Sequence, residues 1–71
     1  MTPNELNEAR QKLGLSIQQM ADAMDVHRDT WGKWARGDRK PDRAAVQLVR
    51  LMVWLHDNRA ATLAKWLDHV G

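Results

Sequence analysis

Closely spaced helix start and stop signals constrain this chain more than any other feature of its sequence. Residues 2–5 have the Thr-x-x-Glu spacing of a capping box, with proline at the first helical position, and residues 16–19 repeat the arrangement as Ser-x-x-Gln. Gly14 and Gly37 stand where helices would end. No stretch has the alternating pattern of a strand. The sequence therefore predicts an all-α fold.

Apolar residues at helical spacing fill the intervals between these signals. Helices are expected over residues 3–13, 17–24, 28–36 and 43–56, and a fifth, capped by Asp57 or Asn58, follows to the end. Asp25 tolerates the left-handed backbone that ends the second helix. The expected architecture is a compact bundle of five helices. The residues expected to face inward around the second and third helices are Ile17, Met20, Ala21, Met24, Val26, Trp31 and Trp34.

Length and composition exclude several classes of function. Seventy-one residues make one domain, residues 1–71, without room for a separate ligand-sensing domain. Cysteine is absent, which excludes thiolate metal sites, and His27, His56 and His69 are scattered without a carboxylate cluster. No catalytic residue, metal, cofactor or small-molecule ligand is therefore expected. No secretory signal or membrane-spanning run is apparent, so a cytoplasmic protein without a membrane partner is expected.

A tight turn joins the second and third short helices. Two such helices make a helix-turn-helix, here over about residues 16–36. The net charge of the chain is only +2, but residues 28–43 contain six Lys and Arg against three Asp. Several of these long side chains lie on the outward face of the third helix, a layout suited to the major groove of DNA. The residues of that face are Arg28, Asp29, Gly32, Lys33 and Arg36.

Residues 13–24, followed by residues 26–41, resemble the Cro/repressor (XRE-type) helix-turn-helix family. The resemblance covers about residues 6–55 and implies a lambda-repressor-like fold that binds double-stranded DNA. The compact size is similar to that of phage or mobile-element regulators. Three positions depart from the family pattern: Ile17 replaces a glutamine, Trp31 replaces a smaller aliphatic residue, and Ala35 replaces an acidic partner of Arg10.

The resemblance implies two sets of DNA-contacting residues. Carried over position by position, the contacts to base edges fall on Arg28, Asp29 and Lys33. Aspartate in this place could accept from a cytosine or orient Arg28. Phosphate contacts are expected at the flanks, from Ser16, Gln18, Gln19, His27, Arg36, Arg39, Lys40 and Arg43.

The stretch 48–55 is apolar almost all round, whereas a surface helix of a monomer should keep a polar face. A dimer interface on the helices of residues 43–70 is therefore expected, and the alternative is a well-buried core within one chain. The residues predicted for the interface are Val49, Met52, Val53, Leu63, Trp66, Leu67 and Val70.

These features together predict a transcriptional regulator. A homodimer would bind an inverted repeat whose halves lie about 34 Å apart, acting as a repressor at promoters that could include its own. The alternative is an antitoxin-like module whose main task is to hold a protein partner, with DNA binding secondary. An enzyme is not expected, because no nucleophile, base and orienting group occur together.

Overall fold

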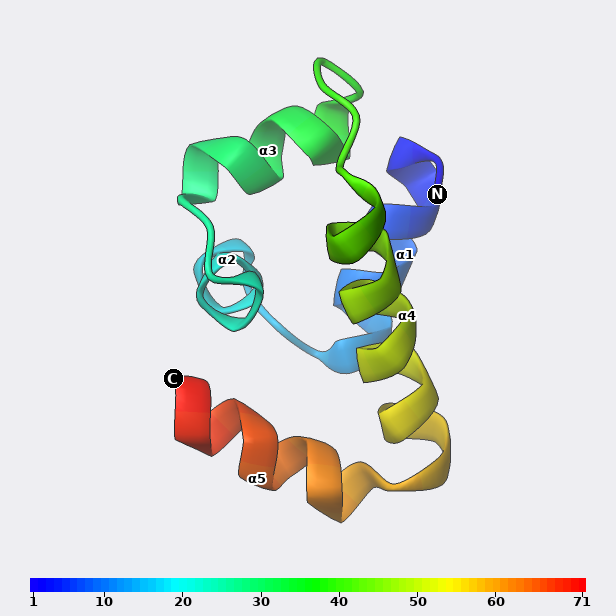
Figure 1. The fold of residues 1–71 in the computed structure, drawn as a ribbon, viewed down its shortest axis with the longest axis vertical. Coiled ribbons are helices and arrows are strands. Elements are labelled where there is room, and N and C mark those ends of the chain that lie inside the picture. Colours follow the sequence, from blue (N-terminus) through cyan, green and yellow to red (C-terminus); the bar gives the residue numbers. More distant parts are fainter.

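The computed structural model describes all 71 residues and contains five α-helices and no strand, which confirms the all-α prediction. In Figure 1, α4 runs along the long axis of the molecule, α3 lies across one end of it and α5 across the other. Helix α2 lies between α3 and α5, and α1 packs behind α4. The helices are α1 (Pro3–Leu13), α2 (Ile17–Met24), α3 (Arg28–Arg36), α4 (Arg43–Asn58) and α5 (Ala60–Val70).

Both predicted capping boxes form. The Thr2 hydroxyl accepts from the backbone N–H of Glu5 at 3.1 Å, and the Glu5 carboxylate accepts from the backbone N–H of Thr2 at 2.8 Å. Ser16 and Gln19 make the same reciprocal pair at 3.1 and 2.9 Å. Each box satisfies a donor that the first turn of a helix leaves free, so these helix starts are fixed locally.

The first three helices each end in a left-handed residue. Gly14 has φ +70° and Gly37 has φ +81°. Asp25, with φ +55°, is the one non-glycine residue in this region, as its sequence position predicts. These sharp stops keep the helices short and turn the chain back on itself twice before residue 28.

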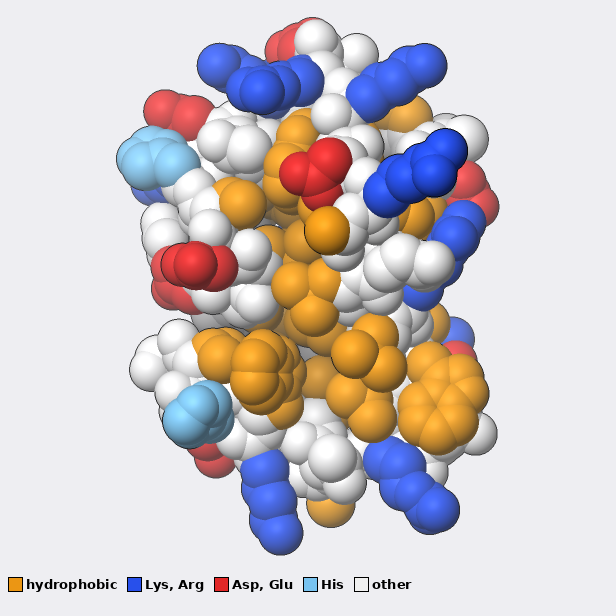
Figure 2. Space-filling view, viewed as in Figure 1, with side chains coloured by type: hydrophobic (Ala, Val, Ile, Leu, Met, Phe, Trp, Pro, Cys, Tyr) orange, Lys and Arg blue, Asp and Glu red, His pale blue; other side chains and the backbone are white.

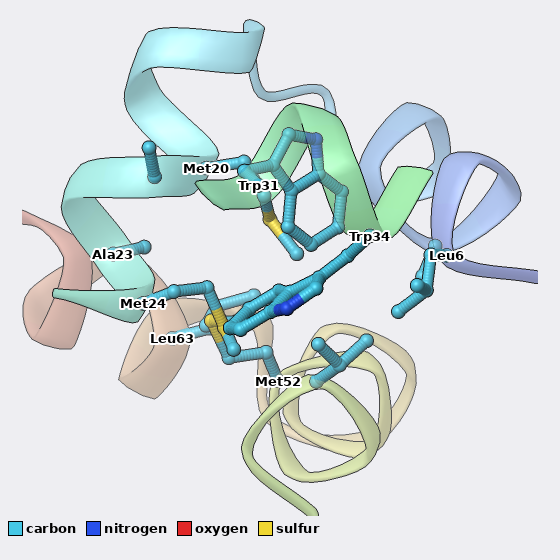
Figure 3. Packing of buried hydrophobic residues seen from close by; sticks show 11 residues of the cluster. Leu6, Met20, Ala23, Met24, Trp31, Trp34, Met52 and Leu63 are labelled. Atoms are coloured by element: carbon cyan, nitrogen blue, oxygen red, sulfur yellow. The ribbon is translucent and has the colours of Figure 1, made fainter. Parts of the chain in front are cut away.

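A core of apolar residues drawn from all five helices holds the fold together (Figure 3). Trp31 and Trp34 meet edge to face, with ring centroids 6.4 Å apart, and are 1% and 6% exposed. Two buried tryptophans on one nine-residue helix anchor α3 by its inner face. The buried residues are Leu6, Ala9, Met20, Ala21, Ala23, Met24, Trp31, Trp34, Val49, Met52 and Leu63.

Side-chain amides and guanidinium groups tie α1 to its neighbours. Asn7 Nδ2 donates to the carbonyl of Pro3 at 3.1 Å and, across the molecule, to the carbonyl of Ala35 in α3 at 3.0 Å. Arg10 donates from a terminal guanidinium nitrogen to the carbonyl of Leu15 at 2.8 Å. With no acidic side chain at position 35, Arg10 thus takes a backbone partner, and its buried Nε has none.

Two sequence predictions about helix packing are wrong. Ile17 fits the apolar stripe of α2 by spacing, yet its side chain is 50% exposed at the first position of that helix. Neither Asp57 nor Asn58 caps α5, because α4 continues to Asn58 and Arg59 precedes α5 without a side-chain cap. Asp57 instead accepts from Lys12 Nζ at 3.0 Å. The amide of Asn58 donates to a carbonyl of its own helix.

The predicted dimer interface is wrong for three of its residues. Val49, Met52 and Leu63 are 1%, 1% and 4% exposed within a single chain, so they belong to its own core and cannot meet a second copy. Some of the apolar residues in this region therefore pack α4 against the rest of its own chain. Of the remaining four, Val53, Leu67 and Val70 are half-buried, and Trp66 is 39% exposed. None of the five helices combines the length and apolar character needed to span a membrane.

Candidate nucleic-acid interface

The N-terminus of α3 is capped by a histidine. His27 has an extended backbone, and its Nδ1 accepts from the backbone N–H of Asp29 at 3.1 Å. An accepting Nδ1 places the proton of the neutral ring on Nε2, which is then a free donor at an exposed position. Val26 before this cap and Trp31 after it both pack in or against the core, the two positions of a hydrophobic staple.

The three residues predicted to contact bases lie together on the exposed face of α3. Arg28, Asp29 and Lys33 are all exposed, and the side chains of Arg28 and Lys33 have no hydrogen-bond or ion-pair partner in the chain. The Asp29 carboxylate lies 3.5 Å from His27 Nδ1 and makes no hydrogen bond to Arg28. Arg28 is therefore free of the orienting contact that the sequence suggested.

Gly32 and Arg36 share the middle of this face. A Cβ placed on Gly32 would lie 2.8 Å from a terminal nitrogen of the Arg36 guanidinium, so that group extends back over the glycine. Arg36 Nε also donates to Asp38 at 3.1 Å, and both side chains are well exposed. The absence of a side chain at position 32 thus opens space that a cation of the same face occupies.

The loop after α3 is anchored at both ends and presents two cations. The backbone N–H groups of Asp38 and Arg39 donate to the carbonyl of Lys33 at 2.9 and 3.3 Å, and Asp42 caps α4 by accepting from Ala45 at 2.8 Å. Arg39 and Lys40 between them are exposed.

Two of the three acidic side chains of this region have partners, whereas most of its cations have none. Asp38 pairs with Arg36, and Asp42 caps α4. The Asp29 carboxylate lies beside His27 Nδ1, which already accepts from a backbone N–H and has no proton to share with it. Figure 2 shows Lys and Arg side chains gathered at the end of the molecule formed by α3 and the following loop. The exposed cations of residues 28–43 that form no ion pair are Arg28, Lys33, Arg39, Lys40 and Arg43.

The N-terminus of α2 offers backbone donors more than side chains. The capping box engages Ser16 and Gln19 with each other, and Gln18 Nε2 donates to Asp22 at 2.9 Å. The first two amides of the helix, those of Ile17 and Gln18, have no acceptor in the chain. Free amides at the positive end of a helix suit an anion.

The sequence prediction missed two features of the site. The bridge from Asn7 to Ala35 fixes α3 against α1, but a single asparagine inside a helix pattern predicts no such contact. The placement of the Arg36 guanidinium over Gly32 depends on the side-chain conformation. A glycine and an arginine four residues apart in a helix could have suggested it, because such positions are neighbours on the helix surface.

Comparison with known proteins agrees with this geometry. A family model described as a helix-turn-helix domain matches residues 4–52, more than half of the chain, and takes in α1, α2, α3 and the first part of α4. No curated protein and no solved structure matches the chain. Helices α2 and α3 are the pair for which such domains are named, with α3 in the place of the helix that enters the DNA groove. The chain belongs to the helix-turn-helix domain family.

Proposed function

We propose that this chain is a sequence-specific DNA-binding transcriptional regulator that acts as a homodimer and represses by occupying its site. The observation that carries the proposal is the excess of unpaired positive charge on and beside α3. Asp38 and Asp42 have partners within the chain, whereas five exposed cations do not. Unpaired cations on a helix anchored from behind by two buried tryptophans are suited to a rigid polyanion.

Base recognition is assigned to the exposed face of α3. Arg28 can donate two hydrogen bonds to O6 and N7 of a guanine, a contact worth roughly 1–3 kcal/mol of discrimination. Lys33, about one and a half turns further along the helix, reaches a second guanine or a phosphate. Asp29 accepts from the amino group of a cytosine.

Phosphate contacts are assigned to the groups that flank α3. Arg39, Lys40 and Arg43 lie on one side, and the free amides at the start of α2 lie on the other. His27 donates from Nε2, and Arg36 donates from the nitrogens that its Asp38 pair leaves free. The side chains of Ser16, Gln18 and Gln19 each retain an O–H or N–H donor for a phosphate beside these amides. Each phosphate neutralised releases counterions, so binding weakens steeply as salt rises.

Repression follows from occupancy. Two copies related by a two-fold axis place their α3 helices in successive major grooves, about 34 Å apart, on an inverted repeat. A dimer bound across a promoter excludes the polymerase. The promoter of the chain's own gene is the first candidate, because occupancy of that promoter would let the chain regulate itself through its concentration.

The test starts from a randomised DNA duplex pool, from which the wild-type chain selects its preferred sequence. Arg28→Ala is then compared with Lys40→Ala, a matched change of one exposed cation. Loss of Arg28 should cost roughly 1–3 kcal/mol on the selected site and abolish the preference at one base pair. Loss of Lys40 should weaken binding to all sequences alike and lower the salt dependence by about one phosphate contact. Enrichment of no sequence, or equal losses for the two variants, would refute sequence-specific recognition by α3.

One observation favours a second candidate, a module whose main task is to hold a protein partner. A groove between α2 and α5 is lined by the apolar Leu15, Ala23 and Leu67 together with Asp22 and Asp68. In that case the randomised pool should yield no preferred sequence. Substitutions in the groove would change function in cells, and those at Arg28 would not.

A further inference from the structure

The two sides of α4 are both apolar but have different surroundings. Val49 and Met52 point into the core and are each 1% exposed. On the other side a second set of residues shows no charge over about 21 Å of helix, although 28% of the chain is charged. We call this set the outer face of α4: Ala44, Gln47, Leu48, Leu51, Trp54, Leu55 and Asn58.

The outer face is where the helix is least covered. Leu51 and Trp54 are 52% and 55% exposed, the largest exposed fractions among the large apolar side chains of the chain. Leu48 and Leu55 are half-buried beside them. Figure 2 shows hydrophobic side chains on the surface over α4 and α5, away from the cations of the α3 end. Leu48 and Leu55 touch the core with part of their surface, whereas Leu51 and Trp54 are left largely uncovered by the single chain.

The spacing along the outer face is that of a coiled-coil seam. Residues 44, 48, 51, 55 and 58 alternate steps of four and three, the repeat by which two helices pack side chains between one another. Gln47 and Trp54 flank the seam on one edge. The charged Arg43, Arg50 and Asp57 lie further round the helix, where a partner helix does not reach. An uncharged seam flanked by a tryptophan resembles the centre of a protein interface.

We propose that the outer face of α4 is the dimer interface, and that its occupant is the same face of a second copy in parallel orientation. The inference rests on the proposed function, which needs two copies with both α3 helices on one side. Helix α3 lies across the N-terminal end of α4 (Figure 1). Parallel α4 helices therefore place both α3 helices at the same end of the dimer, whereas antiparallel ones would place them at opposite ends.

The dimensions of the chain agree with this arrangement. Each copy measures 33 × 20 × 20 Å with α4 along the long axis, so two copies side by side are about twice 20 Å wide. That width accommodates two α3 helices at the spacing of successive major grooves, about 34 Å. One helix face is smaller than the roughly 800 Å² per partner of a standard interface. The dimer therefore dissociates on dilution and is stabilised by binding DNA.

Cysteine cross-linking tests both the interface and its direction, because the chain contains no cysteine of its own. Three single variants place a thiol near the start, middle and end of the seam: Ala44→Cys, Leu51→Cys and Asn58→Cys. Thr62→Cys, at an exposed position of α5, is the matched control. Each purified variant is oxidised with oxidised glutathione, and covalent dimers are quantified on a non-reducing gel.

A parallel pair brings each residue next to its own copy, so all three seam variants should cross-link and Thr62→Cys should not. An antiparallel pair centred on Leu51 would cross-link only Leu51→Cys, and this result would overturn the parallel arrangement. Cross-linking of none of the three, or of Thr62→Cys equally well, would overturn the interface. Circular dichroism on each reduced variant confirms that it is folded.

DNA binding by the same variants separates this inference from the proposed function. Oxidised Ala44→Cys should bind the duplex selected by the wild type more tightly than the reduced form does, because the cross-link removes the cost of dimerisation. Cross-linking in the parallel pattern by a chain that binds no DNA would leave the interface standing and refute the regulator. Selective DNA binding by a chain that does not cross-link at the seam would support the regulator and refute this interface.

Discussion

Gly32 offers a substitution whose effects on stability and on DNA binding should have opposite signs. Glycine inside a helix costs about 1 kcal/mol relative to alanine. Outside the helix backbone, the three atoms nearest to an added Cβ all belong to the Arg36 guanidinium, the end of a flexible side chain that can move. Movement of the guanidinium would disturb the ion pair between Arg36 and Asp38. The side chains of this pair are 63% and 60% exposed, and exposed pairs contribute little to stability. Gly32→Ala should therefore stabilise the free chain by about 0.5–1 kcal/mol.

The gain in stability is measured by thermal unfolding. For a domain of this size 1 kcal/mol corresponds to roughly 4–8 °C, so the Tm should rise by about 2–8 °C. The proposed function places the methyl group on the face of α3 that enters the DNA groove, and it displaces the Arg36 guanidinium from its position over residue 32. Binding to the duplex selected by the wild type should fall about tenfold or more, or about 1.4 kcal/mol. Fluorescence anisotropy at two salt concentrations should also show a weaker salt dependence if Arg36 contacts a phosphate.

Gly14→Ala is the matched control. A Cβ added to Gly14 would have no atom within 4 Å, but the φ of +70° at this position strains any side chain. That variant should lose about 1 kcal/mol of stability and keep its DNA affinity wherever it is folded. A lower Tm for Gly32→Ala would mean that α3 has no room for a methyl group at position 32. A higher Tm with unchanged DNA affinity would refute the placement of Gly32 against DNA.

Three further changes test other contacts. Asn7→Ala removes the bridge to Ala35 and should cost about 1 kcal/mol in urea unfolding while weakening specific binding more than salt-dependent binding, because α3 loses a fixed point. Ser16→Ala removes the cap of α2 and should cost about 1 kcal/mol of stability, seen as a lower Tm. Lys12 and His56 hold the pKa of Asp57 below its ordinary value, so the stabilisation is present at neutral pH and is lost as the pH falls through that lowered pKa. The stability difference between the wild type and Lys12→Met should therefore shrink in acid.

Each of these expectations has a result that contradicts it. Equal loss of specific and non-specific binding in Asn7→Ala would leave that residue a role in stability alone. An unchanged Tm for Ser16→Ala would mean that water replaces the cap at no cost. A stability difference between wild type and Lys12→Met that stays constant from pH 7 to well below the ordinary aspartate pKa of about 3.9 would exclude the Asp57 pair as its source.

The helix boundaries were predictable because the signals that set them are local. The capping box at Ser16 needs only residues three positions apart, and the left-handed ends at Gly14 and Asp25 need only a residue that tolerates that backbone. The exposed face of α3 was predictable for the same reason. Trp31 and Trp34 identify the buried side of a short helix, and the polar residues must then lie opposite.

The sequence could not show which face of α4 is buried, because both faces are apolar and periodicity alone does not distinguish a buried apolar face from an exposed one. Which one is buried depends on where α1, α2 and α5 lie, and these contacts are distant in the sequence. Lys12 shows the same limit, since it engages Asp57, 45 positions away, and removes the expected cap of α5. Ile17 fits the stripe of α2, but at the first helical position no neighbouring element covers it.

Under the proposed function, the residues that anchor α3 differ from those that recognise DNA, so specificity should be able to change without loss of stability. Nine residues with an internal glycine are too few to form a stable helix alone, so α3 depends on its two buried tryptophans and on the Asn7 bridge. Arg28, Asp29 and Lys33 contribute nothing to those contacts. Exchanging Arg28 or Lys33 for glutamine should therefore change the sequence selected from a randomised pool while leaving stability within about 0.5 kcal/mol of the wild type. A large loss of stability in either variant would mean that the recognition face also holds the fold, and that its specificity is not free to vary.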